Sequence, residues 1–189
     1  MKAGHLEYEV HNYMEDVVEE VVQELLAKES DICSCSHCVL DMSAIVLNQI
    51  SPKYLPTVKE PSQLDDDQFT ALLDTVYQSI DKVKKNPRHN ERSETQDYQL
   101  RNHSEAFVNR VLTEILGTCN DILSDPQYIG RIAAISLNTI QPRYALTTKG
   151  ESYLRIAELE HQYLPTTMVA VYQAIKAVAN ENPTVSPEE

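Results

Sequence analysis

Three cysteines stand within a stretch of six residues, at Cys33, Cys35 and Cys38. Soft sulfur donors on a short loop suit a tetrahedral zinc ion, which takes four protein ligands when its role is purely structural. Either His37, inside the loop, or Cys119, far along the chain, would supply the fourth ligand. Three reduced thiols without a metal are the alternative, and the spacing alone does not separate the two interpretations. Such an ion would fix the loop rather than perform chemistry.

A proline, a basic residue and a tyrosine follow one another twice, as Pro52-Lys53-Tyr54 and Pro142-Arg143-Tyr144. The arginine offers a planar fork of donors to a phosphate or a guanine edge, and either tyrosine offers a ring for stacking. The structural alternative is that the proline ends a helix, the tyrosine packs half-buried and the base is merely exposed. Binding is favoured by the presence of a base in both copies of a chain that is otherwise acidic.

An asparagine, Asn48 or Asn138, lies four residues before each of these prolines. Its amide could read the edge of a nucleotide base. The more frequent role of an asparagine near the end of a helix is to satisfy the last carbonyl groups of that helix. Both interpretations stay open.

These motifs belong to a longer repeat. The stretch 47–54 returns at 137–144, and the same offset of 90 residues aligns most of the surrounding sequence. Such self-similarity indicates one unit written twice. Each unit has a small core, so the two are expected to pack together as an intramolecular pseudo-dimer. We expect the first unit at 8–87 and the second at 98–183. A polar linker at 88–97 joins them, and a disordered tail follows at 184–189.

Apolar residues recur at helical spacing in three segments of each unit, which predicts an all-α fold. The first helix of each unit follows Asn12 or Asn102, and a glutamate three residues later, Glu15 or Glu105, completes the pattern of a capping box. A proline ends each second helix. Beyond it we expect a turn at 147–151 in the second unit. The second helix is predicted at 39–49 in the first unit and at 129–139 in the second. The third is predicted at 68–85 and at 168–180.

The chain of 189 residues has 16 basic and 29 acidic residues, a formal net charge of −13. This balance argues against general binding to nucleic acid or to an anionic membrane. No apolar run approaches the roughly 20 residues of a membrane span, and no signal peptide is recognised, so a cytoplasmic protein is expected. No histidine has a nucleophile at a recognisable spacing. We therefore expect a protein that is not an enzyme, with a thiol redox enzyme as the remaining catalytic alternative.

Motifs stand in the same order in the two units. The first unit has Cys33-x-Cys35-x-x-Cys38-x-x-Asp41, Leu47-Asn48, Pro52-Lys53-Tyr54 and Asn86-Pro87, and the second has Leu137-Asn138, Pro142-Arg143-Tyr144, Thr147–Glu151 and Asn182-Pro183. With these motifs the chain resembles the late-competence ComFB family over nearly all of both units. The resemblance implies a small, mainly helical domain that dimerises, holds zinc through cysteines and, in several bacteria, is a receptor for cyclic di-GMP. The chain departs from the family by fusing two units and by lacking the three cysteines in the second.

The resemblance implies an effector that binds cyclic di-GMP and passes the signal to an unidentified protein partner. Cyclic di-GMP is a two-fold symmetric dianion. We call Pro52-Lys53-Tyr54 and Pro142-Arg143-Tyr144 the corners of the two units, and two facing halves would present these matched corners to the ligand. The alternative is a zinc-stabilised interaction module without nucleotide binding, whose acidic first helix docks a basic partner. The residues expected at the nucleotide are Asn48, Lys53, Tyr54, Asn138, Arg143 and Tyr144, supported by Thr147 and Arg131. Those expected at the zinc are Cys33, Cys35 and Cys38, with Cys119 or His37.

Overall fold

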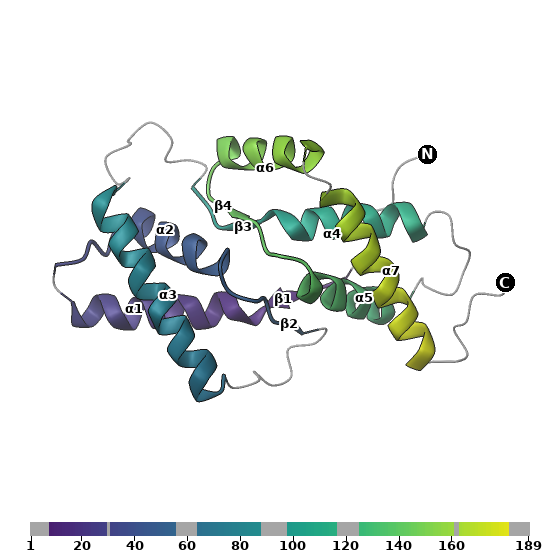
Figure 1. The fold of residues 1–189 in the computed structure, drawn as a ribbon, viewed down its shortest axis with the longest axis horizontal. Helices are drawn as coiled ribbons and strands as arrows, with labels where there is room; N and C mark the ends of the chain where they lie inside the picture. Colours follow the sequence, from purple (N-terminus) through teal and green to yellow (C-terminus); the bar gives the residue numbers. More distant parts are fainter. Residues whose placement is uncertain are drawn as a thin grey trace.

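Helices make up almost all of the regular structure, and they form two sets, one from each half of the chain (Figure 1). The computed structural model describes residues 8–29, 31–55, 64–87, 98–116, 125–160 and 163–181. The first set is β1 (His11–Asn12), α1 (Tyr13–Lys28), α2 (Ser36–Leu47), β2 (Tyr54–Leu55) and α3 (Asp66–Lys85). The second is β3 (Arg101–Asn102), α4 (His103–Leu116), α5 (Pro126–Thr139), β4 (Tyr144–Ala145), α6 (Thr148–Glu160) and α7 (Tyr163–Glu181). The all-α prediction is confirmed. None of the described helices combines the length and the apolar character that crossing a membrane requires.

Helix α1 begins at Asn12, but the predicted capping box is wrong. The Asn12 side chain accepts a hydrogen bond from the N–H of Met14, the second helical residue, at 3.2 Å. Glu15 does not turn back to the cap, because its carboxylate accepts a hydrogen bond from the hydroxyl of Tyr144 in the other unit. A contact between the units has taken the place of the local one.

Helices α2, α3 and α5 begin two or three residues earlier than the apolar pattern predicts, because their first turns contain polar residues. Helix α7 begins at Tyr163, five residues before the predicted start, although Tyr163 and Leu164 are not polar. The predicted turn at 147–151 is the start of α6, where the Thr147 hydroxyl accepts a hydrogen bond from the Gly150 N–H at 3.0 Å. Helix α5 begins at Pro126, capped by the Asp125 side chain rather than near residue 129. A polar cap followed by a polar first turn has no apolar period, so periodicity alone misses it.

Two-residue strands pair within each unit. β1 runs antiparallel to β2, with Asn12 opposite Tyr54, and β3 runs antiparallel to β4, with Asn102 opposite Tyr144. Each pair forms a short ribbon that extends from its own helices towards the other unit (Figure 1). These strands are too short to leave a period in the sequence.

Each core is completed by side chains from the other unit. The core built by α1, α2 and α3 includes Tyr144 and Leu146, with Tyr98 and Leu100 packed against it. The core built by α4, α5 and α7 includes Tyr54 from β2, and residues 8 and 10 pack against it. The expected pseudo-dimer is therefore present, and its halves exchange segments rather than meeting at flat surfaces.

Candidate functional site

Two asparagine–tyrosine pairs join the units around a pseudo-two-fold axis. The Asn48 side chain accepts a hydrogen bond from the backbone N–H of Tyr144 at 2.7 Å and donates one to its carbonyl oxygen at 3.1 Å. Asn138 binds the backbone of Tyr54 in the same way, at 2.7 and 3.0 Å. Each amide supplies the donor and the acceptor that a neighbouring strand would supply. The end of each second helix is thereby fastened to the corner of the other unit.

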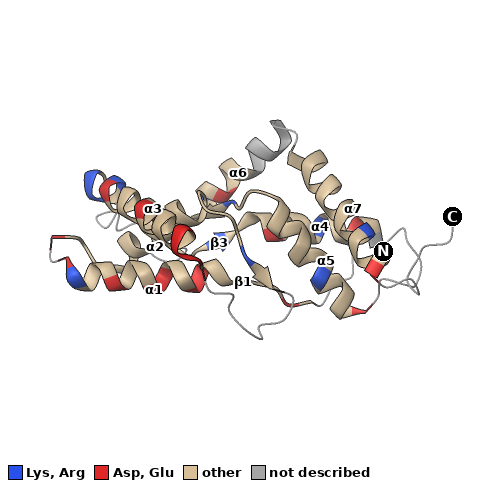
Figure 2. Ribbon diagram, turned by 60° about the horizontal axis from the view of Figure 1, so that its bottom comes forward, with Lys and Arg blue, Asp and Glu red and all other residues tan. Residues whose placement is uncertain are grey.

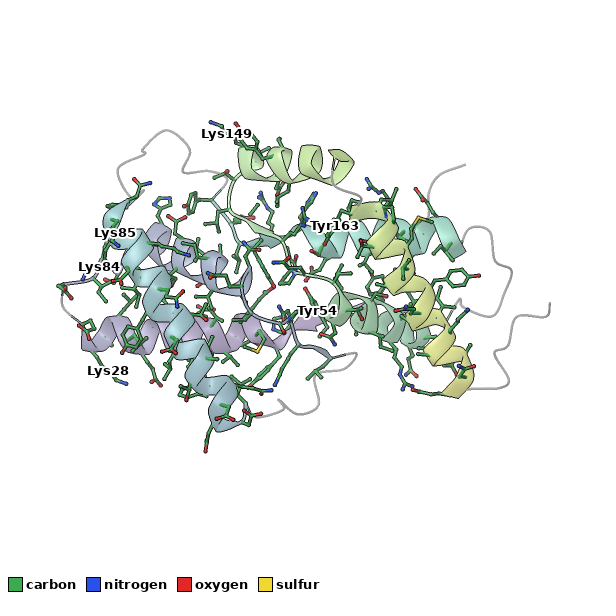
Figure 3. The ribbon with its side chains drawn as sticks, viewed as in Figure 1. Lys28, Tyr54, Lys84, Lys85, Lys149 and Tyr163 are labelled. Carbon is green, nitrogen blue, oxygen red and sulfur yellow. The ribbon has the colours of Figure 1, made fainter. Side chains whose placement is uncertain are left out.

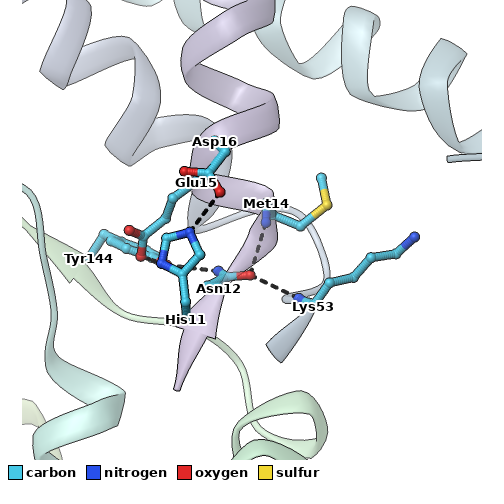
Figure 4. Close-up of polar contacts among 7 residues, drawn as sticks. All are labelled: His11, Asn12, Met14, Glu15, Asp16, Lys53 and Tyr144. Atoms are coloured by element: carbon cyan, nitrogen blue, oxygen red, sulfur yellow. Dashed lines mark hydrogen bonds and ion pairs between the residues drawn. The ribbon is translucent and has the colours of Figure 1, made fainter. Parts of the chain in front are cut away.

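A second layer of hydrogen bonds holds the tyrosine hydroxyls. The Tyr144 hydroxyl donates to Glu15 Oε1 at 2.6 Å and accepts from Asn12 Nδ2 at 2.8 Å (Figure 4). The Asn12 Oδ1 atom also accepts from the Lys53 N–H at 2.9 Å. One asparagine thus caps α1, holds the corner of its own unit and reaches the tyrosine of the other.

The Tyr54 hydroxyl has equivalent partners in the second unit. It donates to Glu105 Oε1 and accepts from Asn102 Nδ2, both at 2.6 Å, and its ring lies between the two units (Figure 3). Burial, followed by the nearby carboxylates, raises the pKa of Tyr54 and of Tyr144 far above the ordinary value. Both hydroxyls therefore stay protonated as donors.

Glu105 is expected to make the chain less stable as the pH rises. Its pKa is raised first by burial and then by the Glu15 carboxylate, while the hydrogen bond from Tyr54 and the charge of His11 oppose the rise. A carboxyl group with a raised folded pKa favours the folded state when protonated, and this contribution is lost as the pH climbs from the unfolded value through the raised one. Glu105→Gln cannot ionise, so its unfolding free energy should fall less than that of the parent chain as the pH rises above the ordinary pKa of a glutamate.

Urea unfolding at a series of pH values measures this difference. Glu114→Gln, at an exposed position on the same helix, is the matched control and should leave the pH dependence of the parent chain unchanged. A pH dependence that is the same in Glu105→Gln as in the parent chain would contradict the assignment.

The tyrosine rings do not have the position that stacking on a ligand requires. Tyr54 and Tyr144 are only 2% and 5% exposed, because each ring fills the core of the other unit. The amides of Asn48 and Asn138 are likewise engaged with backbone groups. These four residues hold the two units together in the structure, and their stacking and base-reading roles stay predictions.

The predicted basic residues lie away from this junction and from one another. Lys53 Nζ is 3.4 Å from the side-chain oxygen of Gln68. The Arg143 guanidinium lies 4.0 Å from the ring centroid of Tyr163. Arg131 forms an ion pair with Glu181 at the end of α7. The matched corners therefore do not converge on one anion site.

A pocket of about 450 Å³ opens between α2 and α3 of the first unit and β4 and α6 of the second. Its volume lies in the range of small-molecule sites. It brings together three of the predicted residues, Asn48, Tyr144 and Thr147. Six of its lining residues are apolar, and its charged and amide side chains, from Asp41, Asn48, Lys82 and Asn86, all belong to the first unit. The remaining polar and glycine positions are Asp41, Lys82, Asn86 and Gly150.

Sequence reasoning missed Lys82 as a member of this pocket. Asp41, Asn86 and Gly150 lie inside the motifs that carry the family resemblance, although none of them is among the predicted ligand-binding residues. Nothing local to Lys82 distinguishes it from the other lysines at the end of α3.

The equivalent place on the other side of the pseudo-two-fold axis has different chemistry. The repeat aligns Asp41 with Arg131, whereas Asn86-Pro87 recurs as Asn182-Pro183. An ion pair joins Arg131 and Glu181 there. The duplicated units are therefore not equivalent at this position.

A smaller hollow of about 250 Å³ lies on the pseudo-two-fold axis. It is lined by residues 48–52 and 138–142, none of which is ionisable. A dianion would find no opposite charge in its lining, so the larger pocket is the better candidate for a phosphate-bearing ligand.

The three cysteines of the predicted metal site do come together. The sulfur atoms of Cys33, Cys35 and Cys38 all lie within 4.8 Å of one another, and ligands of one tetrahedral zinc stand about 3.8 Å apart. Cys119 lies outside the described residues. The ring of His37 packs edge-on against Tyr98, with the centroids 4.5 Å apart. The three thiols could supply three of the four ligands of a structural zinc. Cys33 and Cys35 precede α2, and Cys38 lies in its first turn.

The thiols of the cluster differ in acidity. The backbone N–H of Cys35, followed by its thiol, lowers the pKa of Cys33. Burial, followed by the neighbouring thiols, raises the pKa of Cys38. A bound cation would reverse the second effect, because a coordinated thiol loses its proton.

The fold and the two sites define a two-unit helical protein whose halves exchange segments. A family model described as "Late competence development protein ComFB" matches the chain twice, over residues 11–87 and 101–182. These matches cover most of the chain, and it belongs to the ComFB family as a tandem-repeat member. No curated protein and no solved structure matches the chain in the two other comparisons.

Proposed function

We propose that the chain is an effector that binds cyclic di-GMP in the 450 Å³ pocket and relays the level of this second messenger to a protein partner. The ligand class is the one that the family resemblance implies. The single observation that carries the proposal is the composition of the pocket, whose lining comes from α2 and α3 of one unit and from β4 and α6 of the other. A ligand seated there would touch both halves at once.

Phosphate binding is assigned to Lys82 and to the first turn of α6. The backbone N–H groups at the start of a helix and the positive end of its dipole attract anions. Thr147 and Gly150 place that helix start at the pocket, opposite Lys82 on α3. Together they offer a local positive site in a chain of strongly negative net charge.

Base recognition is assigned to the other polar lining groups. Asp41 offers carboxylate oxygens suited to the donors on the guanine edge, and one of them accepts the Tyr98 hydroxyl at 2.6 Å. Asn86 offers both a donor and an acceptor. Ile45 and Leu154 supply apolar surface for a base face.

The relay follows from the position of the pocket at the junction of the units. A ligand that binds one relative orientation of the halves better than another shifts their populations by the difference in binding free energy. A protein partner that contacts both halves would bind one relative orientation better than the other. Its affinity would therefore change when the nucleotide shifts the populations.

Replacing Lys82 by alanine should weaken cyclic di-GMP binding by about 10- to 100-fold, since a hydrogen bond to a charged group is worth roughly 1.5–3 kcal/mol. Isothermal titration calorimetry measures the affinity and should give one nucleotide per chain, because the equivalent place holds the Arg131–Glu181 pair. Lys85→Ala, three residues further on α3 and exposed, is the matched control and should bind as the parent chain does.

The same titration distinguishes nucleotide binding in the pocket from binding at the corners. If affinity were lost in Arg143→Ala and kept in Lys82→Ala, the nucleotide would sit at the corners instead of the pocket. Absence of heat at micromolar nucleotide would reject the proposal.

The second candidate is a zinc-stabilised interaction module that binds no nucleotide. It is favoured by the burial of Tyr54 and Tyr144, which leaves both corners in structural roles, and by the convergence of the three cysteines. A chain that binds zinc but gives no heat with cyclic di-GMP would support this candidate.

A further inference from the structure

The two pseudo-equivalent helices α3 and α7 each carry an exposed apolar stripe. Its members recur every four residues, and an offset of 95 residues relates the two stripes. The exposed fractions of their outer members, and of Val169 beside the second stripe, lie between 39% and 58%. The stripes are Phe69, Leu73 and Tyr77 on α3, and Leu164, Met168 and Tyr172 on α7. Leu73 is partly buried against the core of the first unit, so Phe69 and Tyr77 are the exposed members on α3.

These stripes stand out against the rest of the described surface. Apart from Tyr153, every large apolar side chain that is strongly exposed in the described part of the chain is on α3 or α7. Single exposed apolar residues need no explanation, but a row of them on one helix face is typical of a contact surface. The two helices lie at opposite ends of the long axis, so one copy cannot pair its own stripes (Figure 1).

The charges that accompany the stripes are of opposite sign. The exposed acids Asp66, Asp74 and Asp81 accompany the α3 stripe. In place of Asp81, the α7 stripe continues to Lys176, which lies over the Tyr172 ring at 5.5 Å. Figure 2 shows acidic residues along α1 and α3, with basic residues at the end of α3, whereas the charged residues of α7 lie towards its C-terminal end.

A second base lies at the other end of the α7 stripe. Arg143 is 4.0 Å from the ring of Tyr163, the residue before Leu164. Of the lysines near the end of α3, Lys84 binds Asp31, Lys82 lines the pocket and Lys85 follows Asp81 by one helical turn. The α3 stripe is therefore accompanied by acids along its length with one base beyond Asp81, whereas the α7 stripe has a base at each end.

We propose that the α3 stripe of one chain docks on the α7 stripe of a second copy, giving head-to-tail self-association that does not depend on the nucleotide. In either helix direction, each end of this contact places an acid beside a base. Antiparallel packing puts Asp81 near the partner's Arg143, and parallel packing puts Asp81 near the partner's Lys176. Pairing two α3 stripes would bring acids together, and pairing two α7 stripes would bring bases together.

A contact between unlike surfaces leaves one free stripe at each end of the assembly. Such heterologous contacts propagate into chains, or into rings where the rotation closes. We expect mass to grow with protein concentration beyond two chains, and the association to weaken as salt screens the flanking charges.

The test uses two matched double variants at exposed positions of the full chain. Phe69→Gln/Tyr77→Gln blocks the α3 stripe, and Leu164→Gln/Tyr172→Gln blocks the α7 stripe. Sedimentation velocity should show that the parent chain grows with concentration and that each variant alone stays a single chain, its association weakened on the order of tenfold or more. An equal mixture of the two variants should form two-chain species and stop there, because only one usable contact remains.

Two results would overturn the proposal. A parent chain that stays single up to roughly 1 mM has no such contact, and the stripes would then belong to another kind of partner. A variant with a blocked α3 stripe that still dimerises alone would show that α7 pairs with itself.

Discussion

Replacing Tyr144 by alanine is expected to lower the free energy of unfolding by about 3–5 kcal/mol, the usual cost of deleting a buried aromatic ring. The ring is 5% exposed and lies in the core of the other unit, so its loss leaves a cavity between the halves. It also removes the hydrogen-bond partner of the half-buried Glu15 carboxylate and of the buried Asn12 amide. Urea unfolding followed by circular dichroism measures the change.

Two comparisons sharpen this prediction. Tyr54→Ala should cost about as much, because its contacts are the pseudo-symmetric equivalents of those of Tyr144. Tyr172→Ala, at a tyrosine that is 58% exposed, should change stability by less than about 0.5 kcal/mol. A cost below about 1 kcal/mol for Tyr144→Ala would show that the exchanged segments do not hold the halves together.

Removing zinc is expected to have the second large effect. A chelator should lower the melting temperature by about 10 °C, which corresponds to a few kcal/mol for a chain of this size, because the ion would tie the segment before α2 through Cys33, Cys35 and Cys38. Cys38→Ser should lower the melting temperature similarly and make it insensitive to the chelator. Scanning calorimetry with and without added zinc measures both.

The fourth ligand can be identified in the same assay. Cys119→Ser and His37→Ala are the matched variants, and the one that reduces the response to zinc carries the ligand. Zinc well below one equivalent per chain, in protein purified without a chelator, would contradict the metal site altogether.

The sequence predicts the helices and the duplication because both are local or periodic properties. Apolar spacing locates α1 and α3 to within a few residues, and the offset of 90 is enough to relate Asn48 to Asn138. The three cysteines lie close in sequence on a short segment, which is why their convergence could also be expected.

The exchange between the units is beyond such reasoning. Asn48 and Tyr144 are 96 residues apart, and no local pattern links an amide on one helix end to the backbone of a distant corner. For the same reason, the capping-box pattern assigns each glutamate to its own helix, although Glu15 serves the other half. Lys82 lines the candidate pocket together with residues of α6 that lie far from it in the sequence, and the polar first turn of α6 conceals that helix in the sequence.

The exchanged segments give the covalent joining of the units a consequence of its own. Two separate chains held by such reciprocal segments would come apart on dilution, since their pairing is bimolecular. In a single backbone, the same pairing is unimolecular, so its occupancy does not depend on how much protein is present. Each half always meets the same counterpart, and one copy can retain the cysteines while the other carries the Arg131–Glu181 pair without producing mismatched assemblies.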